Sequence, residues 1–482
     1  MNGKPSWVVS MLPFVFLVAL LVVVIKIFGA DALEGGSQVA LLAASGLVVA
    51  VSMIFYRIPW RKFEDAITDN FHSVSTSIVI LLLIGAVSGS WMISGVVPTM
   101  IYYGMKVITP SLFLFASCVI CALVAVMTGS SWTTIATIGV ALIGIGTAQG
   151  YDLGWTAGAI ISGAYFGDKV SPLSDTTVLA SSSAGTPIFS HIRYMMITTI
   201  PSFVIACLIF LVASLMHDPV PQSHIADFTN DLKDTFNISP WLFVVPILTG
   251  VLISRKVPAI VTLFVTALLA GVAAIIAQPH IIAAVASGET HPMGHSLGFM
   301  DGFKGLFLTY YGPTALDTGN VALNDLVSTR GMTGMLNTVF LIISAVTFGG
   351  TLVGSGMLQS LTEFLVRHIR RRASMVASTV GTGIFANMVT GDQYLSIILT
   401  SSLYKKLYHD RGYENRLLSR SVEDSATVCS VLIPWNSCGM TQATVLKVAT
   451  LEYLPFCFFN LISPLMSIFV AIIGYKIVRK SK

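Results

Sequence analysis

The chain has 482 residues, of which 54% are hydrophobic and 10% are charged, and its formal net charge is +4. Soluble globular proteins carry about 25% charged residues, so this composition excludes a soluble globular fold. The small net charge argues against nucleic acid as a partner. Apolar stretches near 20 residues, the length needed to cross a hydrocarbon layer of about 30 Å, recur throughout. The pattern predicts an all-α polytopic membrane protein, because a membrane barrel would show short alternating segments instead.

The apolar stretches predict about ten membrane crossings, near 7–28, 37–56, 73–97, 154–186, 192–216, 239–254, 257–278, 335–356, 421–444 and 453–475. Lysine and arginine in short connections mark the cytoplasmic side of a membrane. These residues gather at 57–62, 255–256, 367–372, 405–420 and 476–482. A threading that satisfies all of these clusters places both termini in the cytoplasm and the acidic connection 217–234 outside.

Two apolar stretches are expected to be hairpins. Residues 374–404 lie between two basic clusters and carry TGDQ at their centre, so they are expected to enter the membrane and return on the same side. Residues 110–149 carry TGSSWTT at their centre and form the counterpart, although their longer arms also allow a full span. Backbone that bends at membrane depth needs protein or a wet cavity around it.

The order of these features predicts an inverted repeat, as in many secondary transporters. Residues 81–95 align with 342–356, pairing Gly89 with Gly350, Ser94 with Ser355 and Gly95 with Gly356. TGSSW (128–132) aligns with TGDQY (390–394), and 174–185 align loosely with 425–439. The expected parts are N-terminal scaffold spans (1–60), a first repeat unit (61–216), an external loop with scaffold spans and an external connection (217–334), and a second repeat unit (335–482). Each unit holds one hairpin and one broken helix, at 154–186 and 421–444.

Acidic residues interrupt the apolar segments at Asp168 and Asp175, at Asp392, and at Glu423 and Asp424. A carboxylate at the centre of a membrane helix costs about 2.5–3.5 kcal/mol on insertion scales, so such residues usually face a cavity and are functional. For Glu423 and Asp424, which follow Arg420, a position at the lipid headgroups is an equal alternative.

The segment GDKVSPLSDTT (167–177) reads as a helix break, because Pro172 removes a backbone donor. Carboxylate, hydroxyl and carbonyl oxygens are the ligands of hard cations. A Na⁺ site is therefore expected at Asp175 and Thr176, with Asp175 as the carboxylate shared by Na⁺ and H⁺ and with Ser171 and Ser174 as further ligands. Lys169 is expected either to neutralise Asp168 or to lie at a channel mouth.

Polar residues at the hairpin centres and at the second break are the remaining candidates for ion or solute binding. They are Ser130, Ser131, Thr133, Asn387, Thr390, Asn436 and Ser437.

The stretch FGDKVSPLSDTTVLASSSAG (166–185), with TGSSWTT upstream and IRYMM downstream, resembles the NhaC family of bacterial Na⁺/H⁺ antiporters over about residues 60–470. The resemblance implies sodium–proton exchange in an inner membrane, within the wider ion-transporter superfamily. Members of the family also exchange organic solutes, including malate with protons against lactate with sodium.

The sequence thus predicts a secondary antiporter rather than an enzyme, with no cofactor beyond the transported ions. A Na⁺- or H⁺-coupled exchanger of organic anions or amino acids is the alternative. A channel fits repeated helix breaks less well, and no catalytic dyad is evident for a membrane enzyme. The sequence does not decide the oligomeric state; segments 7–56 and 239–278, poor in charge, are candidates for a homodimer scaffold.

Overall fold

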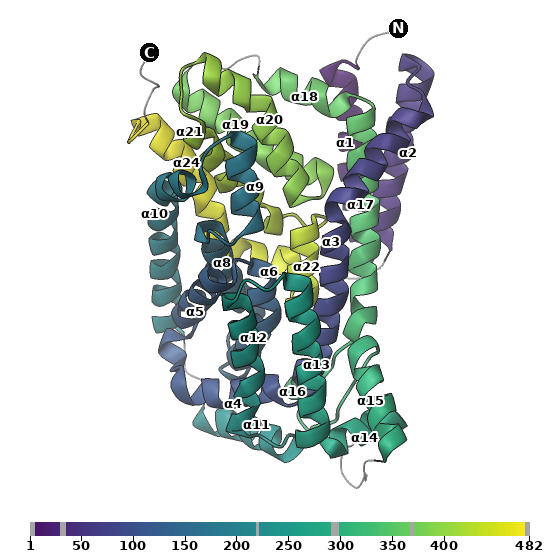
Figure 1. Ribbon diagram of the computed structural model, residues 1–482, viewed down its shortest axis with the longest axis vertical. Helices are drawn as coiled ribbons and strands as arrows, with labels where there is room; N and C mark the ends of the chain where they lie inside the picture. Colours follow the sequence, from purple (N-terminus) through teal and green to yellow (C-terminus); the bar gives the residue numbers. More distant parts are fainter. Residues whose placement is uncertain (1–4, 29–34, 218–220, 291–297, 367–370, 478–482) are drawn as a thin grey trace.

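The fold is described by a computed structural model that covers residues 5–28, 35–217, 221–290, 298–366 and 371–477. Within these ranges the chain is mainly helical and contains no strand apart from an isolated bridge between Thr314 and Thr329. Figure 1 shows the helices packed into an elongated bundle. The predicted all-α fold is confirmed.

The first half of the bundle contains two N-terminal helices followed by the first repeat unit. These elements are α1 (Trp7–Phe28), α2 (Gly36–Tyr56), α3 (Trp60–Ile93), α4 (Val96–Val107), η2 (Pro110–Leu112), α5 (Phe113–Thr128), α6 (Ser131–Thr134), the π-helical turn η3 (Ile135–Gly139), α7 (Val140–Ala148), α8 (Leu153–Val170), α9 (Asp175–Ala184) and α10 (Ile188–Leu215).

A middle region then leads into the second unit. Its elements are α11 (Gln222–Thr235), η4 (Pro240–Phe243), α12 (Val244–Ser254), α13 (Ala259–Ala277), α14 (Pro279–Ser287), α15 (Phe299–Tyr311), α16 (Val321–Val327) and η5 (Gly331–Met335). The second unit consists of α17 (Leu336–Gly354), α18 (Met357–Val366), α19 (Arg372–Thr390), α20 (Gln393–Asp410), α21 (Asn415–Val422), the π-helical turn η6 (Glu423–Thr427), η7 (Ser430–Leu432), α22 (Ser437–Leu446), α23 (Thr450–Tyr453), η8 (Leu454–Phe456) and α24 (Phe458–Ile473).

Among the described residues, eight helices are long and apolar enough to cross a membrane, or ten when each of two bent pairs counts as one span. The span of α1 is 24% buried within the protein, whereas the arm Ser131–Ala148 of the first hairpin is 83% buried. The outer helices therefore offer apolar surface to lipid, and the hairpin arm lies inside the protein. The expected crossings 154–186 and 421–444 each consist of shorter helices joined at a break.

The ends of α3 and α17 have the same local geometry. Ser94 and Ser355 each donate a hydrogen bond to a carbonyl three residues earlier, and each hydroxyl accepts one from the amide two residues later. The glycine that follows has a positive φ, 80° at Gly95 and 71° at Gly356, which a side chain would strain. The helix after the first corner, α4, lies toward the bottom of Figure 1, whereas α18 lies at the top. The two corners therefore share one local geometry and lie at opposite ends of the bundle, as the predicted inverted repeat requires.

The two hairpins enter the bundle from opposite ends. The first follows α4 at the bottom of Figure 1, whereas α19 and α20 lie at the top, where α1 begins and α24 ends. The predicted basic clusters 367–372 and 476–482 fall mostly outside the described residues.

The helices α5 and α8 pack very closely, because α8 turns glycine toward α5. A Cβ added at Gly163 would collide with the Cys118 carbonyl oxygen, and one at Gly167 would lie 2.5 Å from the Ala125 Cβ. These glycines are four residues apart, the spacing that lets membrane helices approach closely. The first hairpin and the first broken helix are joined through this contact.

Replacing Gly163 with alanine should destabilise the protein by about 1–3 kcal/mol, because the added methyl group overpacks the α5–α8 contact. Thermal unfolding in detergent measures the effect. Gly381→Ala is the matched control, since Gly381 is exposed on α19 with no atom near its Cβ position. Equal melting temperatures for the two variants would contradict the close packing.

A topology measurement tests the hairpin at α19–α20. Single cysteines at Arg371 and Arg411, in a background without the six native cysteines, should both react with an impermeant thiol reagent from the same side. A cysteine at Asp227 of α11 should react from the opposite side. Labelling of positions 371 and 411 from opposite sides would show that α19–α20 crosses the membrane.

Candidate functional site

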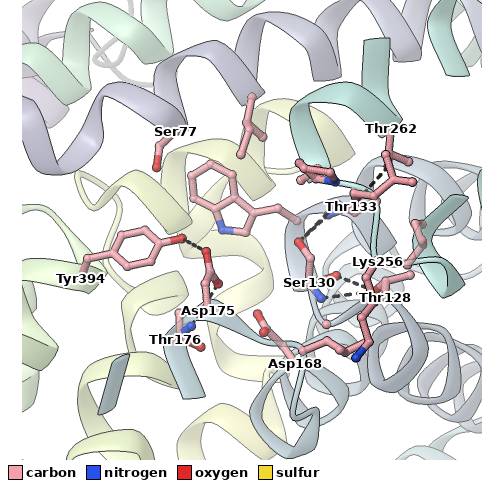
Figure 2. A pocket seen from close by; sticks show the side chains of 18 of the residues that line it. Ser77, Thr128, Ser130, Thr133, Asp168, Asp175, Thr176, Lys256, Thr262 and Tyr394 are labelled. Carbon is pink, nitrogen blue, oxygen red and sulfur yellow. Dashed lines mark hydrogen bonds between the residues drawn. The ribbon is translucent and has the colours of Figure 1, made fainter. Parts of the chain in front are cut away.

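A cavity of about 300 Å³ lies where the two hairpin tips meet the break between α8 and α9. It is lined by both tips, by the break, and by α3 and the α12–α13 turn. Figure 2 shows the Tyr394 hydroxyl directed at Asp175, and it shows the polar side chains that line the cavity. These are Ser77, Thr128, Ser130, Thr133, Asp168, Asp175, Thr176, Lys256, Thr262 and Tyr394.

Asp168 is the buried carboxylate of this cavity, with 5% of its surface exposed. Its Oδ2 accepts hydrogen bonds from the backbone N–H of Ser131 at 3.1 Å and from the Ser131 hydroxyl at 2.7 Å. Its Oδ1 accepts one from the Ser174 hydroxyl at 2.6 Å. Hydrogen bonds to a charged group are the strong ones, so Asp168 ties the first hairpin tip to the helix break.

Asp175 lies at the exposed side of the same cavity, at the start of α9. Its Oδ2 accepts a hydrogen bond of 2.7 Å from the hydroxyl of Tyr394, in the second hairpin tip, and its Oδ1 accepts one from the Thr176 N–H. The two aspartates thus connect the cavity to both repeat units.

Lys169 does not pair with Asp168, which was one of its two expected roles, and it is fully buried rather than exposed at a channel mouth. Its Nζ forms an ion pair with Asp424 and donates a hydrogen bond to Ser463 at 2.9 Å. In the described part of the chain neither Asp168 nor Asp175 is in an ion pair. The cation that borders their cavity is Lys256, at the α12–α13 turn.

The other predicted ligands of the first unit have different roles. Ser130 and Thr133 line the cavity with Thr176, and Ser130 caps α6 by accepting the Thr133 N–H. Ser171 is buried and donates to the Val126 carbonyl, so it fastens the break to α5.

The two hairpin tips share one hydrogen-bonding pattern. Thr128 and Thr390 each donate to the carbonyl two residues later, at 3.2 Å and 3.0 Å, and each hydroxyl accepts the N–H of that residue. A glycine with positive φ follows each threonine, and the next residue, Ser130 or Asp392, is the N-cap of the returning helix. The predicted alignment of TGSSW with TGDQY therefore holds in three dimensions.

The breaks also correspond, although with a different register from the predicted one. Ser174 caps α9 and Asn436 caps α22, so Ser174 is the counterpart of Asn436 rather than of Ser425. The carboxylate lies on a different element in each unit. In the second unit it is Asp392 on the hairpin tip, which accepts a hydrogen bond from Ser437 on the break at 3.3 Å. The counterparts of these two residues are Ser130 on the first tip and Asp175 on the first break.

The predicted residues of the second unit form a cluster that does not border the cavity. Asn387 donates to the Ala426 carbonyl at 2.6 Å and accepts a hydrogen bond from Asn436 at 3.2 Å. Asn387, Thr390, Asp392, Asn436 and Ser437 are all buried. This cluster of polar side chains therefore stabilises the broken backbone around η6.

Glu423 and Asp424 lie in η6 and are fully buried within the protein. Asp424 pairs with Lys169 and accepts hydrogen bonds from the hydroxyls of Thr198 and Ser463.

Sequence reasoning missed Tyr394, Lys256 and Arg420. Tyr394 belongs to TGDQY, so its position beside the tip was a usable signal. Lys256 and Arg420 were read as topology markers, and no local pattern shows that one borders the cavity and the other is fully buried.

Comparison with known proteins agrees with this architecture. A model of the Na⁺/H⁺ antiporter family matches residues 5–185 and 163–475. The chain is 35% identical to the Na⁺/H⁺ antiporter NhaC of Bacillus subtilis, over 90% of its own length and 91% of that protein. It is 34% identical to the malate-2H⁺/Na⁺-lactate antiporter of the same organism, over 84% and 82% of the two chains. It is 29% identical to the arginine/ornithine antiporter ArcD of Halobacterium salinarum, over 99% and 94%.

The shared tip pattern predicts that Thr128→Val and Thr390→Val both lower the melting temperature. Each change leaves a turn without its hydroxyl partner, and an unsatisfied buried group costs about 1–3 kcal/mol. The loss should be larger for Thr390, which is fully buried, than for Thr128, which is partly exposed. Thr390→Ser keeps the hydroxyl and is the control; a valine variant as stable as the serine variant would exclude a structural role for these bonds.

Proposed function

Because the chain belongs to the Na⁺/H⁺ antiporter family, we propose that it exchanges Na⁺ for H⁺ by alternating access, with the two ions competing for the carboxylates of the cavity. The observation that supports this best is a pair of aspartates that face one cavity between the two repeat units and form no ion pair with any residue that the structure describes. The protein is a multi-pass membrane protein. We place it in the cytoplasmic membrane with both termini inside, in accordance with the positions of its basic clusters.

The cavity offers oxygen ligands of the kind that Na⁺ prefers. Asp168 and Asp175 supply charge, and Ser130, Thr133 and Thr176 supply hydroxyls. The sequence singled out Asp175 as the shared carboxylate. We assign that role to Asp168, because it is buried while Asp175 is exposed, and we assign to Asp175 the admission of the ion at the cavity mouth.

Competition for one carboxylate is sufficient to couple the two ions. An isolated ionised carboxylate is very costly to hold away from water, whereas one neutralised by Na⁺ or H⁺ is not. A protein that changes its accessibility only with Asp168 neutralised therefore exchanges one ion for the other and does not leak. The inverted units provide two related conformations for this change.

Exchange of an organic anion or amino acid is a second candidate function. The cavity volume of about 300 Å³ exceeds what a bare ion needs and reaches the lower end of small-molecule pockets, which are about 300–1,000 Å³. Lys256 at the rim could neutralise the carboxylate of such a solute. The names of the malate/lactate and arginine/ornithine relatives agree with this alternative.

Asp168→Asn should abolish Na⁺-driven proton movement in proteoliposomes, together with the thermal stabilisation that NaCl gives relative to choline chloride, because a ligand stabilises only the protein that binds it. Asp175→Asn should keep exchange but raise the Na⁺ concentration for half-maximal rate about tenfold, a loss of about 1.4 kcal/mol. Asp301→Asn, on exposed α15, is the matched control.

Retention of Na⁺-dependent stabilisation by Asp168→Asn would exclude Asp168 as the ion ligand. Stabilisation of the wild type by lactate or malate, lost in Lys256→Gln, would instead favour the organic-solute alternative.

A further inference from the structure

A second group of charges lies away from the cavity, between α8, α21 and η6. It contains two cations, Lys169 and Arg420, and two carboxylates, Glu423 and Asp424, and all four residues are completely buried. The proposed exchange at Asp168 and Asp175 uses none of them.

Asp424 is well satisfied in this group. It pairs with Lys169, accepts from Thr198 at 2.9 Å and 3.1 Å, and lies 3.9 Å from the Nε of Arg420. Asp424 is thus the carboxylate of this group whose oxygens have hydrogen-bond and ion-pair partners.

Glu423 has the opposite environment. Within the described chain neither of its carboxyl oxygens has a hydrogen-bond partner. The Thr427 hydroxyl, about one turn further on, is close enough to interact with the carboxyl but makes no hydrogen bond of ordinary geometry. The guanidinium of Arg420, three residues before Glu423, likewise makes no hydrogen bond and lies 4.9 Å from the Tyr194 ring centre.

Two opposing effects act on the protonation of Glu423. Without hydrogen bonds, an ionised carboxylate in the interior is very costly, which favours a proton on Glu423. With Glu423 protonated, however, Lys169, Arg420 and Asp424 leave one buried positive charge uncompensated. Ionised Glu423 would make the group neutral. The balance can therefore be shifted by a small movement that brings Glu423 and Arg420 together.

The local backbone is of a kind that allows such a movement. Glu423 begins a π-helical turn, an element frequently found at functional sites. Its released carbonyls are held by side chains of other helices, since Asn387 donates to Ala426 and Asn460 donates to Val428 just after the turn.

The titratable and charged groups in and around this group of four residues come from several helices. They are Asp168 and Lys169 of α8, His191 and Tyr194 of α10, Tyr408 of α20, Arg420 of α21, and Asp424 and Cys429 in and after η6. The packed helices α19 and α24 contribute Asn387, Asn460 and Ser463, which do not titrate.

We propose that Glu423 is a second proton-exchanging carboxylate, separate from the cavity, whose ionised form is neutralised by Arg420 and Lys169. The proton leaves Glu423 for water when the site opens and returns from water on the other side. Lys169 directly follows Asp168 on α8, so a displacement of α8 on ion binding would move the cation that faces Glu423. This link to transport depends on the proposed antiport, whereas the proton site itself does not.

Infrared difference spectroscopy of the purified protein between low and high pH tests the site directly. The wild type should show the C=O stretch of a buried protonated carboxylic acid that disappears as the pH rises. Glu423→Gln should lose the component of this band that persists in Asp168→Asn, because protonated Asp168 contributes a component of its own, and Asp424→Asn should retain the Glu423 component. In Arg420→Gln the band should persist to higher pH, because the cation that stabilises the ionised form has been removed.

An unchanged band in Glu423→Gln, or an unchanged midpoint in Arg420→Gln, would overturn the proposal. If Glu423→Gln does not fold, Glu423→Asp keeps the carboxyl group and should shift the frequency of the band, and an unshifted band would count equally against Glu423.

Transport assays separate this proposal from the first one. Glu423→Gln should retain Na⁺-dependent thermal stabilisation while Na⁺-driven proton movement falls at least tenfold; unaltered proton movement would exclude a transport role for Glu423. Asp168→Asn should lose the Na⁺ response but keep the infrared band. If Asp168→Asn keeps both the infrared band and its Na⁺ response, the cavity mechanism is rejected and the proton site at Glu423 is still supported.

Discussion

The need to compensate buried carboxylates governs the arrangement of this protein. Each buried acidic side chain has a different environment: hydroxyls and an amide surround Asp168, the start of α20 holds Asp392, and two cations flank Asp424. Some of the partners come from other helices, since Ser131 bonds Asp168, Ser437 bonds Asp392 and Lys169 pairs with Asp424, so the carboxylates also help to determine which helices meet. The charges to which we assign transport are thereby part of what holds the interior together.

Interrupted helices provide the donors for these contacts. A straight membrane helix uses its own amides internally, so it can offer few of them to an ion or a carboxylate. The breaks and hairpin tips expose amides and carbonyls inside the protein, and serine, threonine and asparagine side chains satisfy the rest. The same solution appears once in each inverted unit. Placing the charge on the break in one unit and on the tip in the other makes a symmetric scaffold electrically asymmetric.

The sequence predicted the features that depend on local composition. Apolar length predicted most of the spans, although two of the eight, Pro110–Thr128 and Ser131–Ala148, are arms of the stretch expected to be a hairpin. The TGSSW and TGDQY tips and the Pro172 break were found where the pattern placed them. It did not predict partners that are distant along the chain. Lys169 follows Asp168, yet consecutive residues on a helix do not face each other, so Lys169 points to Asp424, 255 residues away. Lys256 and Arg420 were not predicted either, because both belong to basic clusters. The sequence of such a cluster does not show whether a residue in it faces water or the protein interior.

The glycine contact between α5 and α8 also limits how the molecule can change shape. At this contact the backbone of α8 packs directly against α5, and no side chain lies between them that could adopt another rotamer. The two helices therefore have little freedom to slide past each other. The hydrogen bond between Ser131 and Asp168 lies at the end of this same pair of helices. The proposed ion ligands of the first hairpin and the first broken helix are therefore expected to move as a single rigid body. Opening to either side of the membrane would then consist of this body tilting against α3, the α12–α13 turn and Tyr394. The geometry among the residues within the body would not change.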